Sequence, residues 1–143
     1  MANLSRLSIV TPSALKFEGD VSMVVAPGAA GDLAALASHA PMLTTLRTGV
    51  VSATVASGGA DQQTSGGRVL FAVEGGFMQI LPDRVIILTD LALSREEVDV
   101  EAARSDLKRA EEALAQKRGA DGFQERKAVA WAQARLAITA RPV

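Results

Sequence analysis

The sequence predicts an α+β protein in which an N-terminal antiparallel β-sandwich is followed by a C-terminal antiparallel two-helix hairpin. Short β-rich runs separated by turn signals fill residues 1–92, whereas a helical period with charged residues between its apolar positions fills residues 93–143. The charge distribution agrees with this division. Ten of the 15 Lys and Arg and nine of the 16 Asp and Glu lie from Arg95 onward, as expected for helices with solvated outer faces.

The turn signals divide the first half into short strands. Phe17-Glu18-Gly19-Asp20 reads as a turn, and Gly75-Gly76 reads as the positive-φ turn of a hairpin between two β-patterned runs. A Gly-, Ser- and Gln-rich stretch spans residues 57–67. Many short strands without long helices between them favour a sandwich or barrel. The expected strands are residues 7–11, 21–25, 50–55, 69–73, 77–81 and 85–88.

The second half predicts two helices. Ser94 can cap the first helix, with Glu96 and Glu97 in its first turn, and residues 119–122 interrupt the period before a second helix that runs to about Thr139. The apolar positions are mostly small, so we expect the hairpin to be marginally stable alone and able to change its packing. The periodic positions are Val98, Ala102, Leu107, Ala110, Leu114, Val129, Ala132 and Leu136.

Composition excludes several classes of function. A formal net charge of −1 argues against nucleic-acid binding, and the absence of cysteine removes disulfides, thiolate nucleophiles and cysteine-ligated metals. The N-terminus shows no leader pattern, and the longest apolar runs are too short to cross a bilayer. Four Phe, one Trp and no Tyr offer little for stacking bases or sugars. We therefore expect no enzyme activity and no cofactor, and only indirect contact with a membrane.

Individual residues carry weak chemical signals. His39 is the only histidine, without a convergent nucleophile or ligand set, so its ring either bonds to turn backbone or contacts a partner, and a catalytic role is the least favoured. The glycines of residues 27–32 lack the Lys-Ser/Thr of a phosphate-binding loop. Trp131 either packs on the strand half, which we slightly favour, or anchors a partner.

One combination of motifs is more specific. Phe17-x-Gly19 is followed by the segments Val24-Val25-Ala26-Pro27-Gly28-Ala29-Ala30-Gly31-Asp32-Leu33 and His39-Ala40-Pro41-Met42-Leu43-Thr44, and later by Val73-Glu74-Gly75-Gly76-Phe77 and Val85-Ile86-Ile87-Leu88-Thr89-Asp90. This order resembles the epsilon subunit of the bacterial and chloroplast F-type ATP synthase over nearly the whole chain.

The resemblance implies a ten-stranded sandwich and a helical hairpin in a non-catalytic central-stalk subunit. Its sandwich would bind the gamma subunit and the c-subunit ring and help couple proton flow to ATP synthesis. Its hairpin would reach the catalytic alpha/beta head and restrain hydrolysis, and the subunit would be peripheral on the cytoplasmic face of the bacterial inner membrane. The partner-binding residues carried over are Asp32, which would face the ring, and His39, Pro41 and Met42.

A nucleotide site is only weakly implied. Asp99 matches a hydrophobic-Asp-x-x-Arg-Ala motif that binds ATP in some relatives, and Arg109 matches a basic position beyond it, but Ala102 stands where the motif has Arg. A stand-alone sandwich adaptor with a helical dimerisation hairpin fits the periodicity equally well, although it leaves the His-Ala-Pro motif unexplained.

Overall fold

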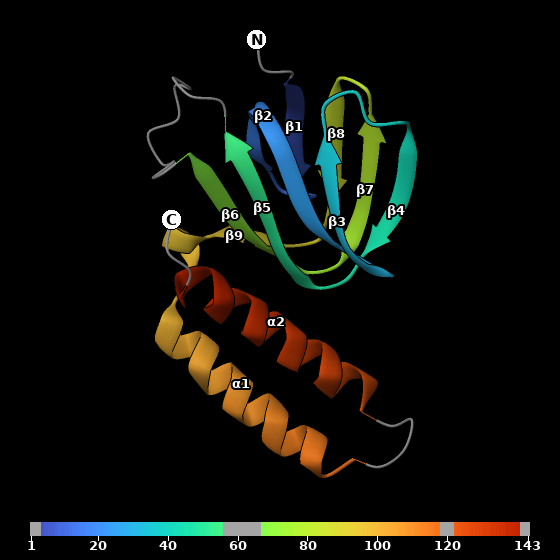
Figure 1. The fold of residues 1–143 in the computed structure, drawn as a ribbon. Helices are drawn as coiled ribbons and strands as arrows, with labels where there is room; N and C mark the ends of the chain where they lie inside the picture. Colours follow the sequence, from blue (N-terminus) through green and yellow to red (C-terminus); the bar gives the residue numbers. More distant parts are fainter. Residues whose placement is uncertain (1–3, 56–66, 118–121, 141–143) are drawn as a thin grey trace.

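A computed structural model describes residues 4–55, 67–117 and 122–140 and shows a β-sandwich with a helical hairpin packed beneath it (Figure 1). The predicted Gly-rich stretch and the predicted break between the helices lie almost wholly outside the described residues. The strands are β1 (Ser5–Val10), β2 (Leu15–Gly28), β3 (Gly31–Leu36), β4 (Met42–Leu46), β5 (Gly49–Val55), β6 (Arg68–Val73), β7 (Gly76–Leu81), β8 (Arg84–Leu88) and β9 (Ala92–Ser94). The helices are the 3-10 turn η1 (Arg95–Glu97), α1 (Val100–Ala115) and α2 (Phe123–Ala140).

The strands form two layers that share β2. One layer has the order β3-β2-β5-β6-β9, and the other has the order β1-β8-β7-β4, with β1 also paired to the first half of β2. The predicted sandwich is therefore confirmed, with one departure from an antiparallel arrangement, because β1 and β8 run parallel. The described residues contain nine strands, one fewer than the resemblance implied.

Alternating side chains fill the space between the layers. Leu7, Ile9, Met78, Ile80 and Ile87 are fully buried, and their strand neighbours face outward, as a period of two requires. The rings of Phe17 and Phe71 meet edge to face with centroids 6.0 Å apart, which ties β2 to β6 across the core.

The predicted turn at residues 17–20 is wrong, because β2 continues through it. The strand pairs with β1 up to Val21 and then with β5, and a register shift between Val21 and Met23 marks the change of sheet. Gly19 is a packing position: a Cβ there would lie 3.1 Å from the ring of Phe17. A glycine beside an acidic residue resembles a turn in sequence, but here it makes room for an aromatic ring.

The predicted hairpin at Gly75-Gly76 is also wrong. Both glycines have positive φ, as expected, but β6 pairs with β5 and β9 while β7 pairs with β4 and β8. The two residues carry the chain from one layer to the other. The backbone of Gly76 lies close to the end of β8, since a Cβ on Gly76 would lie 2.1 Å from the carbonyl oxygen of Leu88.

The first helix starts later than predicted. Ser94 and Glu97 form a capping box, but it closes only the single turn η1, and α1 begins at Val100 after Asp99, whose side chain accepts a hydrogen bond from the amide of Ala102 at 3.1 Å. The apolar face of α1 is also shifted, because Ala103 is buried and Ala102 is exposed. The second helix extends one residue past the predicted end.

The hairpin contacts the sandwich through α2, which lies between the strands and α1 (Figure 1). Ala134 and Ile138 on α2 pack against Leu70 and Ala72 on β6, and Trp131 lies at the edge of this cluster. The slightly favoured intramolecular packing of Trp131 is thus confirmed.

Candidate partner-binding surface

The residues predicted to bind partners lie at opposite ends of β3. Asp32 is near the start of this strand, whereas His39 and Pro41 follow its end in the connection to β4. At a rise of about 3.3 Å per residue, the strand separates Asp32 from Leu36 by about 13 Å. The structure therefore does not bring the predicted residues into one site.

Asp32 lies in an ion pair at the end of the sandwich that faces the hairpin. Its Oδ1 accepts a hydrogen bond from Nη2 of Arg47 at 2.8 Å, and Nε of Arg47 donates to the carbonyl of Gly28 at 2.8 Å. About three quarters of the Asp32 side chain is exposed. Such an exposed pair contributes little to stability, which leaves the carboxylate available to a cationic partner.

His39 takes part in a compact corner at the other end. Nδ1 lies 2.6 Å from the carbonyl oxygen of Ala40, and the amide of Ser38 donates to Pro82 on the β7–β8 turn. The ring thus bonds to turn backbone, the first of the two readings predicted for it. Pro41 and Met42 are exposed beside it.

Sequence reasoning missed an exposed apolar strip on the outer face of β4, β7, β8 and β2. Phe77 pairs with Leu88, and Leu88 pairs with Val10, which pairs with Leu15. Leu15, Phe77 and Leu88 are 50–56% exposed, and Leu43 on β4 is 69% exposed. We define the apolar strip as Leu43, Phe77, Leu88 and Leu15. The strip was predictable in part, because Phe77 alternates with the apolar residues that fill the core.

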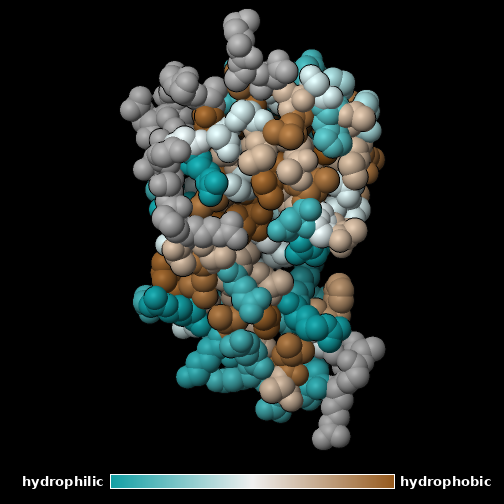
Figure 2. All heavy atoms as spheres, viewed as in Figure 1, coloured by the Kyte–Doolittle hydropathy of each residue, from teal (hydrophilic) through white to brown (hydrophobic). Residues whose placement is uncertain are grey.

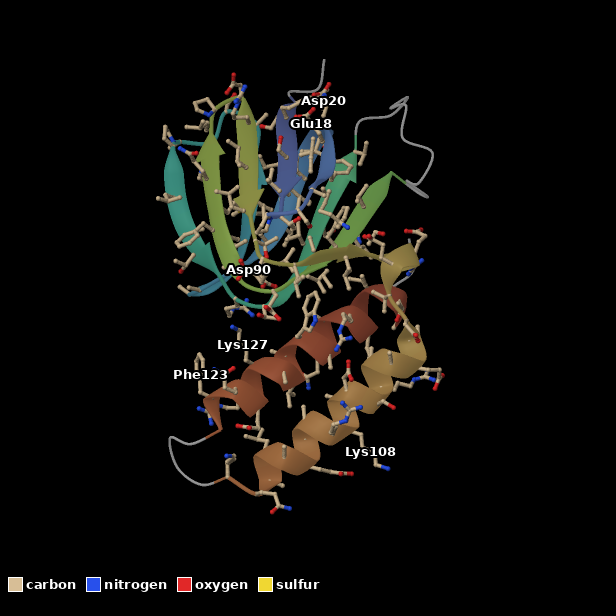
Figure 3. The ribbon with its side chains drawn as sticks, turned by 180° about the vertical axis from the view of Figure 1, so that it is seen from behind. Glu18, Asp20, Asp90, Lys108, Phe123 and Lys127 are labelled. Atoms are coloured by element: carbon tan, nitrogen blue, oxygen red, sulfur yellow. The ribbon has the colours of Figure 1, made fainter. Side chains whose placement is uncertain are left out.

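Charged residues lie at the other end of β1 from the strip. Arg6 donates from Nη2 to Glu18 at 3.2 Å and from Nη1 to Asp20 at 3.3 Å, where β1 and β2 meet (Figure 3). The hydrogen bonds that Arg6 donates to these two carboxylates raise its pKa. An exposed cluster of large apolar residues such as this strip is typical of protein interfaces.

The outer face of the opposite layer also carries apolar side chains. Met23 and Val25 on β2 and Leu36 on β3 point outward, and Figure 2 shows hydrophobic residues exposed over these strands while the lower part of the hairpin is largely hydrophilic.

The residues of the weakly implied nucleotide site are not brought together. Asp99 caps α1, and Arg109 lies ten residues later, about 15 Å along the helix axis. Arg109 instead approaches Asp106 at 3.8 Å, and Asp106 also accepts a hydrogen bond from Arg135 on α2 at 3.0 Å. In this conformation Asp99 therefore caps α1, and Arg109 lies beside an acidic residue of its own helix.

Within the described ranges, no group of three or more His, Asp or Glu residues lies close enough together to hold a metal ion. No helix in the same part of the chain is both long and apolar enough to span a membrane.

The fold and its exposed surfaces define a protein-binding module. A model of the ATP synthase delta/epsilon chain β-sandwich domain matches residues 5–95. ATP synthase epsilon chains from Desulforamulus reducens and Moorella thermoacetica are 39% and 40% identical, over 80% of this chain and 80% and 78% of theirs. The fold is similar to a chain in the Euglena gracilis mitochondrial ATP synthase, with a TM-score of 0.74, 20% identity and coverage of 96% of this chain and 81% of that one.

The chain belongs to the ATP synthase epsilon chain family, whose members are stalk subunits of a membrane-associated complex rather than its catalytic subunits. This membership removes the basis for a stand-alone dimeric adaptor.

Proposed function

We propose that this protein is a rotor subunit that binds the gamma subunit through the apolar strip and the His39 corner, and the c-subunit ring through the end that carries Asp32. The observation that carries the proposal is the apolar strip itself. Four large apolar side chains stand 50–69% exposed on one sheet face, and such clusters on soluble domains mark protein interfaces. Contacts at both ends of a rigid sandwich would let it transmit torque during proton-driven synthesis.

The chemistry of each end favours a different partner. Leu43, Phe77 and Leu88 offer a hydrophobic contact of the kind found in permanent complexes. Asp32, exposed and paired with Arg47, offers a carboxylate to basic polar loops, where charge complementarity sets register and partner choice. His39, Pro41 and Met42 lie at the edge of the first surface.

The hairpin is proposed to act on the catalytic alpha/beta head and to restrain ATP hydrolysis. Its helices carry exposed charges on the faces turned away from the sandwich, such as Lys108 on α1 (Figure 3). ATP binding is not part of the proposal, because Ala102 replaces the motif's arginine and Asp99 is occupied as a helix cap. The whole subunit would be peripheral, on the cytoplasmic face of the bacterial inner membrane.

The two contacts can be tested separately in the assembled complex. Phe77→Asp should reduce recovery of the gamma subunit with the tagged chain, whereas Gln79→Asp, which adds the same charge on the same strand face, should reduce it less. Asp32→Lys should weaken retention of the ring and lower proton-driven synthesis, with Glu112→Lys on the exposed face of α1 as the charge-matched control. Unchanged gamma binding in Phe77→Asp would contradict the assignment of the strip, and unchanged coupling in Asp32→Lys would remove Asp32 from the interface.

The regulatory role has its own test. A chain ending at Leu93 should raise the ATPase activity of the assembled head relative to the full chain, if the hairpin restrains hydrolysis. Equal activity would mean that it does not.

A further inference from the structure

The contacts that hold the hairpin to the sandwich are concentrated at one end of α2. Ala134 and Ile138, in its C-terminal half, pack against Leu70 and Ala72 with Val98 beside them. This end lies next to η1, where the chain leaves the sandwich (Figure 1). The buried apolar cluster is small, because two of its four fully packed members are alanines.

The other half of α2 stands away from the strands. A groove of about 890 Å³ separates it from the lower end of the sandwich. Arg47 on the sandwich and Lys127 on α2 both line this groove, and Figure 3 shows Lys127 on the side of α2 that faces the strands. The buried apolar contacts between α2 and the strands therefore lie in the C-terminal half of the helix, whereas the N-terminal half borders this open space.

Two polar contacts join η1 to the elements on either side. Nζ of Lys16 on β2 donates to Oε2 of Glu97 at 2.6 Å, and only 19% of the Lys16 side chain is exposed. The other oxygen of Glu97 accepts hydrogen bonds from the amide and the hydroxyl of Ser94 at 2.9 and 3.2 Å. Glu97 therefore joins η1 both to Ser94, the residue that precedes it, and to β2 of the sandwich.

Arg95 makes the second contact. Its Nε donates at 3.0 Å to the carbonyl oxygen of Ile138, near the C-terminal end of α2. The last carbonyls of a helix lack partners within the helix, and a guanidinium there also interacts favourably with the helix dipole. Arg95 thus ties the far end of the chain's last helix to the turn that leaves the sandwich, 43 residues earlier.

We propose that Glu97 and Arg95 form a latch that sets the position of the hairpin: Glu97 holds η1 to β2 through Lys16, and Arg95 holds the C-terminal end of α2 to η1. Release of both contacts frees the whole hairpin to swing about residues 95–99 while the helix pair stays intact. The pairing of α1 with α2 through Arg135 and Asp106 is independent of the latch, since neither residue contacts η1 or the strands in the bonds described. The proposal concerns the isolated chain and does not rest on the partner assignments above.

The absence of cysteine from the sequence permits a direct test by thiol labelling of the full chain. Ala134→Cys introduces a single thiol, at a position 5% exposed, inside the contact between hairpin and sandwich. Its labelling rate then reports how often the hairpin opens. Val24→Cys, in a separate protein at a position 0% exposed in the sandwich core, reports global unfolding.

Glu97→Gln and Arg95→Gln should each raise the labelling rate at position 134 about five- to tenfold, because each removes a hydrogen bond to a charged group that is partly screened by solvent. The double variant should show the product of the two effects, and the rate at position 24 should not change. Glu101→Gln breaks the exposed pair between Glu101 and Arg104 on α1 and serves as the matched control.

Two results would overturn the proposal. One is a labelling rate at position 134 in the double variant equal to that of the parent and of Glu101→Gln, which would mean that the apolar cluster alone holds the hairpin. The other is an equal rise at positions 134 and 24, which would mean that the two residues stabilise the entire fold and do not act as a latch.

Discussion

Removing the side chain of Ile138 should detach the hairpin without unfolding the sandwich. Ile138 is 0% exposed and is the largest fully buried residue between the two parts, packed with Leu70, Ala72 and Ala134. Truncation of a buried isoleucine to alanine costs about 2–5 kcal/mol, and more where the surroundings cannot collapse. Its neighbours lie on a β-strand and a helix with fixed backbones, so we expect about 3 kcal/mol for Ile138→Ala.

Trp131 makes this change visible. It is the only tryptophan, it is half-buried at the edge of the same cluster, and the guanidinium of Arg135 lies 5.4 Å from its ring. In Ile138→Ala, the tryptophan emission should shift to longer wavelength at a lower denaturant concentration than the loss of β-sheet circular dichroism. In the parent protein the separation between the two transitions should be smaller.

Phe123→Ala is the matched control. It removes a larger side chain from the start of the same helix, but that side chain is 65% exposed (Figure 3), so stability should change by less than about 0.5 kcal/mol. A single transition in Ile138→Ala, with the two signals coincident, would refute the reasoning. It would mean that sandwich and hairpin unfold as one unit.

Three further predictions concern single positions. Gly76→Ala should destabilise the sandwich by about 3 kcal/mol or more in chemical denaturation, because φ is +123° and the new Cβ would meet the carbonyl of Leu88, whereas Gly31→Ala, with open space around it, should cost less. Asp99→Ala should cost about 1 kcal/mol through loss of the α1 cap, measured in the same way, and Asp99→Asn should restore most of it. Burial raises the pKa of Glu97, but hydrogen bonds from Lys16 and Ser94 outweigh it and leave the pKa below its ordinary value of 4.5. The contribution of Glu97 to holding η1 is therefore full above about pH 4.5 and lost as pH falls through the lowered value. The labelling rate at position 134, divided by that of an exposed thiol at the same pH, should rise there, and Glu97→Gln should remove that rise. An identical pH profile in the variant would contradict the prediction.

The strands of the sandwich were predictable where short apolar runs are bounded by turn residues. Residues 77–81 and 85–88 are such runs, and both become strands at nearly those bounds. Turn chemistry was less informative. Gly19 and Gly75 are each followed by a residue compatible with a tight turn, yet one lies inside a 14-residue strand and the other crosses between layers. Partner choice between strands depends on contacts distant in sequence, which local patterns do not contain.

The candidate surface was only partly predictable for a similar reason. Asp32 and His39 were identified from the motifs around them, but their separation follows from the direction of β3, which sequence spacing alone does not give. Leu43 and Phe77 also lie within motifs of the resemblance, but only the register of β4 and β7 shows that they face outward. The latch could not be predicted, since it joins Lys16, Arg95, Glu97 and Ile138 across up to 122 residues.

The central claim is that the sandwich binds a rotating stalk. It is tested most directly by recovering the partners of the tagged full-length chain from its native membranes. The account predicts that the gamma subunit and ring subunits are recovered together with the chain, and that Phe77→Asp recovers less gamma than Gln79→Asp does. Recovery of a second copy of the chain alone, or of no partner, would contradict it.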